Sequence, residues 1–304
     1  MKRVLTITLL SILCGTVYSE TSLNSLLLSA AKKGNISDIR TYVARGADVE
    51  AADPFDGNTA MHFAAFQSDS KMVQTLLALG ADRNNPNHDG LTPLHIACVK
   101  GDLDFVKLMI GWGADINTQE EFTGKTPLYS AAEGGYTEIV QLLLRYGADA
   151  SVHAYYRNYS PLNIALSKKY FIIAMMLLKA GVSVNTLSIH KFTPMHWAAY
   201  ENNIEAVKLL LDNGAAVDAY SYHGMTPLHI AAMNGNVEMI RLLLEAGADP
   251  FARTLIMWDK IPPGSIPADV ARLYDHPDIV MLLLTAKKID KSATEPDKKK
   301  KKQK

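Results

Sequence analysis

The sequence predicts an all-α repeat solenoid, in which helix pairs of one design stack along a single axis. Two observations predict it: a short motif recurs at a fixed spacing, and an apolar helical stretch follows each copy. The motif is clearest in "GLTPLHIAC" from Gly90 and "GMTPLHIAA" from Gly224. Its copies are 33, 34, 34, 33 and 33 residues apart, with hydroxyl residues at Thr59, Thr92, Thr126, Ser160, Thr193 and Thr226. Such a period is typical of units that bury their apolar faces against their neighbours.

Each part of the repeat has a local physical reason. The Thr hydroxyl can cap a helix, and Pro at the next position suits the first turn because its missing N–H costs nothing there. The Ala pair that follows predicts a close approach between first helices of neighbouring repeats. A stretch such as "IVQLLLRYGAD" then places leucines on one stripe of a second helix, and its Gly can take the left-handed conformation that ends the helix. Each repeat is therefore expected to be a helix pair with a hairpin loop.

The pattern T-P-L-H-x-A-A, followed by V-x-x-L-L-x-x-G-A-D, resembles the ankyrin repeat over most of the chain. The resemblance implies about eight stacked ankyrin repeats in residues 20–286. The first, "SLLLSAAKKGNISDIRTYVARGADVE", lacks Thr-Pro and His, as is typical of a terminal cap. The last follows an insertion, because 40 residues instead of 33 separate Thr226 from Ile266. We interpret residues 251–265, which include Trp258, as a long loop near the C-terminal cap and leave open a part in binding.

The first nineteen residues, "MKRVLTITLLSILCGTVYS", predict a secretory signal peptide over residues 1–19 and an exported, periplasmic or secreted protein. The apolar run is about fourteen residues long, shorter than the roughly twenty of a membrane-spanning helix. A lipoprotein acylated on Cys14 and an uncleaved anchor stay open as alternatives, although Leu13 and Ser11 fit a lipoprotein cleavage site poorly. After cleavage only Cys98 would remain, so no internal disulfide is expected.

Charge is unevenly distributed along the chain, although 31 basic residues balance 31 acidic ones. Without Lys2, Arg3 and nine tail lysines, 31 − 11 = 20 basic residues stand against 31 − 3 = 28 acidic ones, a net charge near −8. This argues against a nucleic-acid partner, since phosphate contacts need a basic face. We expect the lysine-rich tail, residues 287–304, to be disordered. It is interpreted as a solubilising end, with electrostatic contact between Lys298–Lys302 and the cell envelope as the alternative.

The sequence holds no recognisable catalytic motif. His190 and His223 stand at equivalent places in adjacent repeats, but helices stacked about 10 Å apart would not bring both to one zinc ion unless the loops bend together. Cys98 takes an Ala position and is interpreted as a small buried residue. The resemblance implies that four histidines hydrogen-bond backbone between repeats: His62, His95, His196 and His229. We therefore predict no enzyme activity, no cofactor and no metal site.

In ankyrin proteins, partners usually meet the concave face, which is made of hairpin tips and inner helices. The fold does not dictate which residues stand there. Nine of the chain's 24 aromatic residues fall there, most densely in "HAYYRNYSPLNIAL", a copy that keeps Ser160 and Pro161 and has Asn158 where Gly would take a positive φ. The alternative is that the rings only stack and stiffen the hairpins. The predicted contact residues are Phe55, Phe66, His88, Phe122, Tyr155, Tyr156, Arg157, Tyr159, His190, Phe192, Tyr200, Tyr222, His223 and Met225.

Together these observations predict a non-catalytic protein–protein interaction scaffold that acts outside the cytoplasm of a bacterium. The chain is predicted to be a monomer that binds another protein. Two alternatives remain: a secreted effector directed at a host protein, and an envelope-associated structural component held by its basic tail.

Overall fold

The computed structural model describes residues 23–286, which form two compact units divided between Tyr156 and Arg157. The units are described one at a time. The predicted signal peptide, Cys14 and the lysine-rich tail lie outside the described residues. Over residues 23–286, none of the helices is both long and apolar enough to span a membrane.

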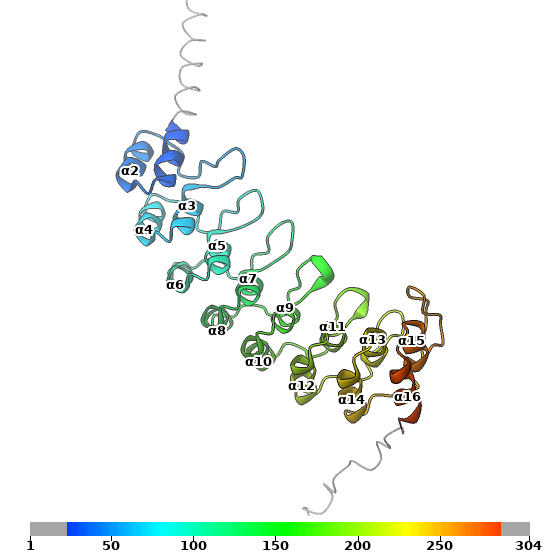
Figure 1. Ribbon diagram of the computed structural model, residues 1–304. Helices are drawn as coiled ribbons and strands as arrows, with labels where there is room; N and C mark the ends of the chain where they lie inside the picture. Colours follow the sequence, from blue (N-terminus) through cyan, green and yellow to red (C-terminus); the bar gives the residue numbers. More distant parts are fainter. Residues whose placement is uncertain (1–22, 287–304) are drawn as a thin grey trace, which may run out of the picture. The chain divides into compact units, whose positions relative to one another are not determined.

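The first unit, described over residues 23–156, contains four helix pairs joined by short turns and separated by hairpin loops (Figure 1). The first helix covers residues 23–32. The others are α2 (Ile36–Ala44), α3 (Ala60–Gln67), α4 (Ser70–Ala78), α5 (Pro93–Lys100), α6 (Leu103–Gly111), α7 (Pro127–Gly134) and α8 (Thr137–Arg145).

The second unit, described over residues 157–286, also contains four helix pairs. Two short 3-10 turns, η1 (Tyr156–Asn158) and η2 (Ile189–Lys191), lie in its hairpin loops. Its helices are α9 (Pro161–Ser167), α10 (Phe171–Lys179), α11 (Pro194–Tyr200), α12 (Ile204–Asp212), α13 (Pro227–Asn234), α14 (Val237–Glu245), α15 (Pro267–Leu273) and α16 (Pro277–Thr285).

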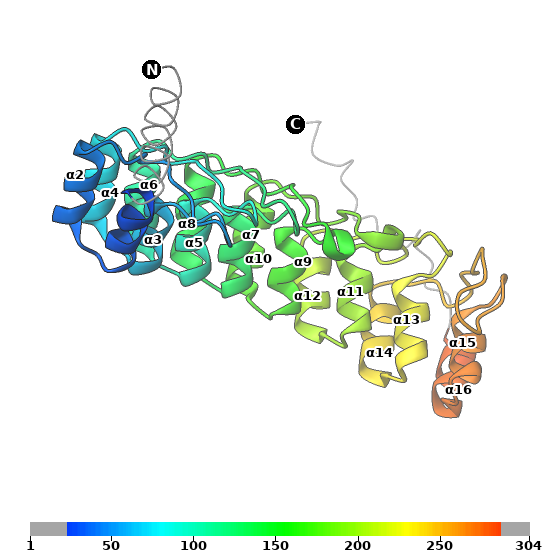
Figure 2. The ribbon, with the colours of Figure 1, turned by 90° about the horizontal axis from the view of Figure 1, so that it is seen from above.

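Eight helix pairs thus occupy residues 23–286, which confirms the predicted all-α solenoid of about eight repeats. Within each unit, odd-numbered helices form an inner row beside the hairpin loops, and even-numbered helices form an outer row (Figures 1 and 2). The Ala pairs are buried where inner helices touch, as at Ala131 and Ala132. The leucine stripes are buried as well, as at Leu76 and Leu143. The core is therefore a line of small interfaces between successive repeats.

Four of the eight repeats are joined to the next by a histidine, as the resemblance implied. In all four, the backbone N–H of the capping Thr donates to the histidine Nδ1 at 3.1 or 3.2 Å. Because that Nδ1 is an acceptor, the ring proton belongs on Nε2, which can donate to the next repeat. The Nε2 distances to carbonyl oxygens are 2.9 Å for His62 and Leu91, 3.3 Å for His95 and Lys125, 3.0 Å for His196 and Met225, and 3.1 Å for His229 and Ser265.

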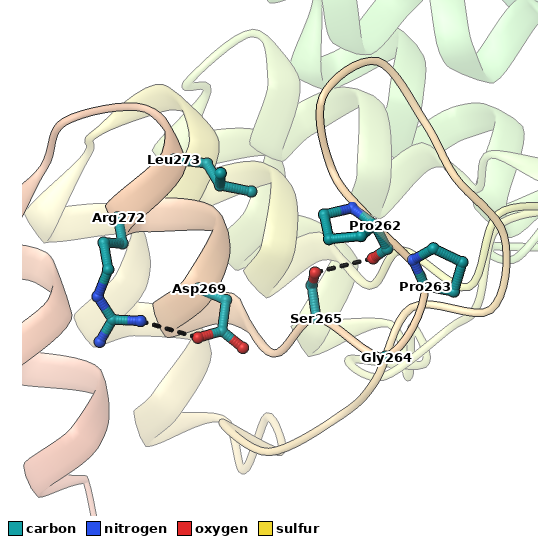
Figure 3. A pocket seen from close by; sticks show the side chains of 7 residues that line it. All are labelled: Pro262, Pro263, Gly264, Ser265, Asp269, Arg272 and Leu273. Carbon is teal, nitrogen blue, oxygen red and sulfur yellow. Dashed lines mark hydrogen bonds and ion pairs between the residues drawn. The ribbon is translucent and has the colours of Figure 1, made fainter.

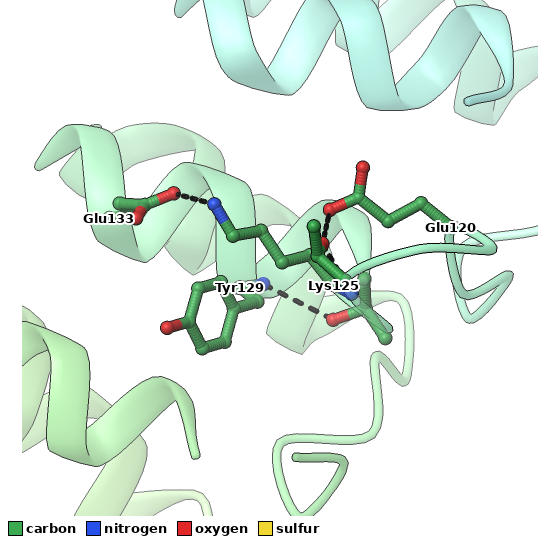
Figure 4. A network of polar contacts seen from close by, with 6 residues as sticks. Glu120, Lys125, Tyr129 and Glu133 are labelled. Carbon is green, nitrogen blue, oxygen red and sulfur yellow. Dashed lines mark hydrogen bonds and ion pairs between the residues drawn. The ribbon is translucent and has the colours of Figure 1, made fainter. Parts of the chain in front are cut away.

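The fourth repeat replaces this histidine with Tyr129, whose ring is buried. The hydroxyl of Thr126 accepts from the Tyr129 backbone N–H at 3.2 Å, so the helix cap is kept. The Lys125 ammonium lies 5.6 Å from the ring centroid of Tyr129 and forms an ion pair with Glu133 at 2.6 Å (Figure 4). The repeat therefore covers its tyrosine with a cation held by its own helix.

The fifth repeat has Asn163 at the same position. Its side chain accepts from the capping residue, as the histidine does, but makes no bond to the next repeat. Its Oδ1 accepts from the Ser160 backbone N–H at 3.2 Å and from the Ser160 hydroxyl at 2.6 Å. Its buried Nδ2 has no hydrogen-bond partner. A cavity of about 10 Å³ lies against Asn163 and the Trp197 side chain of the next repeat. The carbonyl that a histidine would meet here is that of Phe192, the residue before the next Thr, and it already accepts from the Ser188 N–H at 2.8 Å and from the Ser188 hydroxyl at 2.9 Å.

We expect Asn163→His to stabilise the second unit by about 1 kcal/mol, because the ring replaces the unpartnered Nδ2 with an Nε2–H that can donate to the Phe192 carbonyl in place of the Ser188 hydroxyl, and it fills the cavity. Asn163→Ala is the matched opposite change. It should destabilise by about 1–2 kcal/mol, since it leaves the Ser160 N–H without its acceptor. Urea unfolding of the three proteins at pH 8 measures both values. A destabilised Asn163→His protein would show that the interface cannot accept the larger ring.

The last repeat departs from the others on the side where another repeat would pack. Asp269 takes the place of the bridging histidine, and Arg272 takes the place of the second alanine, which is fully buried as Ala232 one repeat earlier. Arg272 Nη1 and Asp269 Oδ1 form an ion pair at 2.9 Å, and both side chains are exposed. A charged pair in a position reserved for alanine is the feature expected of a terminal cap.

Candidate protein-binding surface

Hairpin loops carry the predicted contact residues, and their tips need backbone with positive φ. Glycine fills this need in the regular hairpins, for example Gly90 with φ +76°. Two hairpins of the second unit have no glycine there and instead use Arg157 and Asn158, and His190 and Lys191, with φ between +52° and +60°. The positive φ expected at Asn158 is thereby confirmed. Side chains at these positions cost about 1 kcal/mol or more each, so the fold alone does not favour them.

In the first unit, the predicted contact residues are exposed. Phe55 is 92% exposed and Phe122 is 67% exposed, each at the tip of a hairpin loop. The Tyr155 ring is anchored, because its face lies against the Gly124 backbone, and the Tyr155 N–H donates to the Thr123 carbonyl at 2.7 Å. The other predicted residues of this unit are also exposed: Phe66, His88 and Tyr156.

In the second unit, the structure divides the predicted residues into two groups. The exposed ones are Arg157, His190, Tyr200 and Tyr222, and His223 is half-buried. Three predictions are wrong: Tyr159 is 6% exposed, Phe192 is 4% exposed and Met225 is fully buried. These three directly precede the capping residue of their repeat, where the chain turns inward, so their side chains pack beneath the hairpins and cannot meet a partner.

Two buried and three half-buried rings form one connected group, which we call the ring layer: Tyr159, Phe192, Trp197, His223 and Trp258. Trp197 is its centre, with ring centroids 5.0 Å from Tyr159 and 5.3 Å from Phe192. Trp258 contacts Phe192 and stacks on His223, both at 5.9 Å. For these residues the alternative interpretation, in which rings stiffen the hairpins, is the correct one.

The sequence pointed to Trp258 only as part of the insertion, and it did not single out Trp197. The insertion is a long loop, as predicted, with an antiparallel bridge between Trp258 and Ile261. Backbone hydrogen bonds tie it to the preceding hairpin, since the Leu255 N–H donates to the His223 carbonyl at 2.9 Å. Trp197 had one sequence signal, which is that it fills the variable position of T-P-L-H-x-A-A with the largest side chain.

Arg157 lies on the ring layer and remains exposed. Its guanidinium carbon is 5.3 Å from the Trp197 ring centroid and 5.9 Å from the Tyr159 ring centroid. Its Nη1 donates to the Tyr159 hydroxyl at 3.4 Å. Stacking on an aromatic face holds the planar guanidinium in one orientation.

A pair of histidines lies at the neighbouring hairpin tips. The ring centroids of His190 and His223 are 5.6 Å apart, and partial burial together with the His190 charge lowers the pKa of His223. In the part of the chain that the structure describes, no three His, Cys, Asp or Glu side chains are grouped to hold a metal ion. Cys98 is fully buried, and burial raises the pKa of its thiol, so the reactive thiolate is disfavoured.

A cavity of about 410 Å³ lies where the insertion meets the last helix pair (Figure 3). Pro262 and Pro263 line one side, and the ion pair of Arg272 and Asp269 lines the other (Figure 3). Leu273 completes the apolar part of the lining. The cavity exists because the longer loop rises beside the capping repeat.

Comparison with known proteins agrees with these repeats. A family profile described as "Ankyrin repeats (3 copies)" matches residues 27–120, 113–188 and 187–254. No curated protein matches the sequence significantly. Among solved structures, the crystal structure of the human ASB11 ankyrin repeat domain is similar, with a TM-score of 0.61 and 29% sequence identity over 74% of this chain and 98% of that chain. The family profile ends at residue 254, within the first part of the insertion.

Proposed function

Because the chain belongs to the ankyrin-repeat family, whose members are typically protein-binding scaffolds and generally non-catalytic, we propose that it binds one protein partner through its hairpin tips and inner helices. The observation that carries the proposal is the exposure of large aromatic side chains at those tips, above all Phe55, Phe122 and Tyr222. The helix pairs pack without these side chains, so the fold gives no reason for them. Exposed aromatic rings are typical of binding hot spots.

The hairpins that carry the exposed rings are held in place by packing and hydrogen bonds. In the second unit, the ring layer and the backbone bonds between successive loops hold the tips in place before a partner arrives. The Tyr222 N–H, for example, donates to the His190 carbonyl at 2.7 Å. A surface ordered in advance loses little conformational entropy on binding, which favours affinity.

We further propose that the protein acts outside the cytoplasm of a bacterium. The support is the sequence of residues 1–19, with its basic start and short apolar run. Mass spectrometry of the protein recovered from the producing cells tests this, with cleavage after Ser19 as the expected result. An intact N-terminus in the cytoplasmic fraction would refute it. The effector and envelope hypotheses are separated by where the protein–partner pair is recovered: in host material, or with the bacterial envelope.

The binding proposal is tested by affinity capture from the native envelope fraction, using a variant with Phe55, Phe122, Tyr155, Tyr200 and Tyr222 changed to alanine. We expect the amount of one captured partner to fall by at least about tenfold, as is typical when hot-spot rings are removed. The matched control is Tyr146→Ala with Ile172→Ala, which removes exposed apolar side chains from the outer helices. Equal capture by the wild-type protein and a folded hairpin variant would contradict the proposal.

A further inference from the structure

One part of the second unit has a charge unlike the rest of the chain. Residues 150–200, between Asp149 and Glu201, contain no aspartate or glutamate, although the chain has 31 acidic residues. The same stretch carries five cations: Arg157, Lys168, Lys169, Lys179 and Lys191. The part between the basic ends has a net charge near −8, so without this stretch the remainder is near −8 − 5 = −13. Residues 150–200, which cover repeat five and the first helix of repeat six, are therefore a cationic zone in an acidic protein.

Four of these five cations lie on the side of the hairpins and inner helices. Arg157 and Lys191 stand at hairpin tips, and Lys168 and Lys169 follow the inner helix α9. Among the ion pairs that join described residues, none involves Lys168, Lys169 or Lys191. Lys179, the fifth, ends the outer helix α10 and is also exposed.

Three of the four cations have a backbone with positive φ, a conformation that does not favour a long side chain. Arg157, Lys169 and Lys191 have φ of +56°, +62° and +57°, the region in which glycine is the favoured residue. The first unit has glycine at the places that correspond to Lys169 and Lys191, such as Gly135 and Gly90. Two cations at glycine positions and a third, Arg157, with a positive φ weaken the fold slightly, so we look for their role in what these side chains bind.

Apolar groups accompany the cations. Tyr200 and Tyr222 are each about half exposed, and Ile189 lies beside His190 at the tip. Arg157 lies on the ring layer. The Asn158 side chain donates to the Leu187 carbonyl at 3.2 Å, and this hydrogen bond joins the two hairpins that lack glycine. The carboxylate of Glu201 marks the edge of this zone and accepts from the Ser167 hydroxyl at 2.9 Å.

We propose that this cationic aromatic surface, made of Arg157, Lys168, Lys169, His190, Lys191, Tyr200 and Tyr222, binds an acidic peptide segment of the partner. Carboxylates of the peptide pair with the Arg157 guanidinium and the lysines, and apolar side chains of the peptide lie on the tyrosines. The inference rests on the proposed function and adds the chemistry of the partner.

The hairpins of the first unit support this assignment by contrast. Their exposed carboxylates include Asp56, Asp89 and Glu121, so hairpins of this fold are not cationic by default. The Arg157 guanidinium and the tyrosines are held in fixed positions, so a ligand must be ordered to match them. A bound peptide meets this requirement better than a fluid layer of lipid headgroups.

The test is selection of binding peptides from a random twelve-residue phage library on the chain without its predicted signal peptide. We expect selected peptides to be rich in Asp and Glu with an aromatic or aliphatic residue among them. In fluorescence anisotropy, a selected peptide should bind Arg157→Gln/Lys191→Gln at least about tenfold more weakly than wild type. Its affinity should also fall between about 50 and 300 mM NaCl, as expected for exposed charges.

The matched control is Lys179→Gln, which removes a charge of the same stretch from the outer helix and should change the affinity less than about twofold. Arg157→Lys keeps the charge and should weaken binding partly, because it loses the planar fork. Vesicles with about 30% phosphatidylserine and a single-stranded oligothymidine test the other anionic ligands.

The proposal is overturned if the selected peptides show no acidic excess, if no peptide is selected, or if Lys179→Gln weakens binding as much as Arg157→Gln/Lys191→Gln. Binding to vesicles or to the oligonucleotide without binding to acidic peptides would overturn it as well. These outcomes are independent of the capture experiment. If a partner is captured through the hairpin tips but the library yields neutral or basic peptides, the proposed function stands and the acidic ligand is refuted.

Discussion

Stability should decrease steeply as the pH falls from about 6.5 to about 4, because three bridging histidines are buried in their neutral form. Burial lowers the pKa of His95, His196 and His229 to about 4. Burial also lowers the pKa of His62. Geometry gives the same direction, since Nδ1 of each ring already accepts the Thr N–H and has no room for a proton.

The sign follows from proton uptake. In the unfolded chain these histidines titrate near 6.5, whereas in the folded protein they stay neutral to about pH 4. Below pH 6.5 the unfolded state therefore binds more protons, and the free energy of unfolding falls with pH. Their stabilisation is complete above pH 6.5, and each histidine loses about 3 kcal/mol by pH 4.

Urea unfolding at pH 8, 6, 5 and 4.5 measures this dependence, and the slope reports how many protons the unfolded state gains. Asn163→His serves as an internal control, because it adds a fifth buried ring. It should raise stability at pH 8 and steepen the loss below pH 6.5. A free energy of unfolding that stays constant from pH 7 to 4.5 would refute the buried neutral histidines.

Replacing His196 with alanine should destabilise the second unit by about 3 kcal/mol at pH 8. The change removes the acceptor of the Thr193 N–H and the donor to the Met225 carbonyl, and it leaves a void at a fully buried position. The unsatisfied Thr193 N–H costs about 1 kcal/mol or more, and the lost bond to Met225 and the void add to that. The variant should also lose one histidine's share of the pH dependence.

The matched control is His88→Ala, in which the lost ring is exposed at a hairpin tip. Its unfolding free energy at pH 8 should differ from wild type by less than about 0.5 kcal/mol. Chemical denaturation of both variants at pH 8 and pH 5 separates the two cases. A loss in His196→Ala no larger than in His88→Ala would show that the bridge contributes little.

The repeat could be predicted well because its rules are local. A Thr or Ser before Pro marks the start of an inner helix, and the structure begins α5 at Pro93 and α9 at Pro161 as this rule requires. The histidine bridges followed from the family resemblance, and in all four the ring meets the residue before the next helix cap. The insertion was also predictable, since a departure from a fixed period is visible in the spacing alone.

The predicted contact surface was correct only in part. Periodicity places Tyr159, Phe192 and Met225 in the hairpins, but it does not say whether a side chain there faces solvent or the neighbouring hairpin. Phe192 is buried because Trp197 of its own repeat and Trp258 of the insertion, 66 residues further along, close over it. That contact depends on how three loops come together in space.

The sequence by itself determined the fold class, the number of repeats, their capping residues and the absence of acidic residues between Asp149 and Glu201, because each of these depends on the order of residues along the chain. The tertiary structure alone decided which aromatic rings are buried in the ring layer and which are exposed. The reason is physical: a helix cap is made by residues three positions apart, whereas the exposure of a ring depends on side chains that only the folded stack brings together.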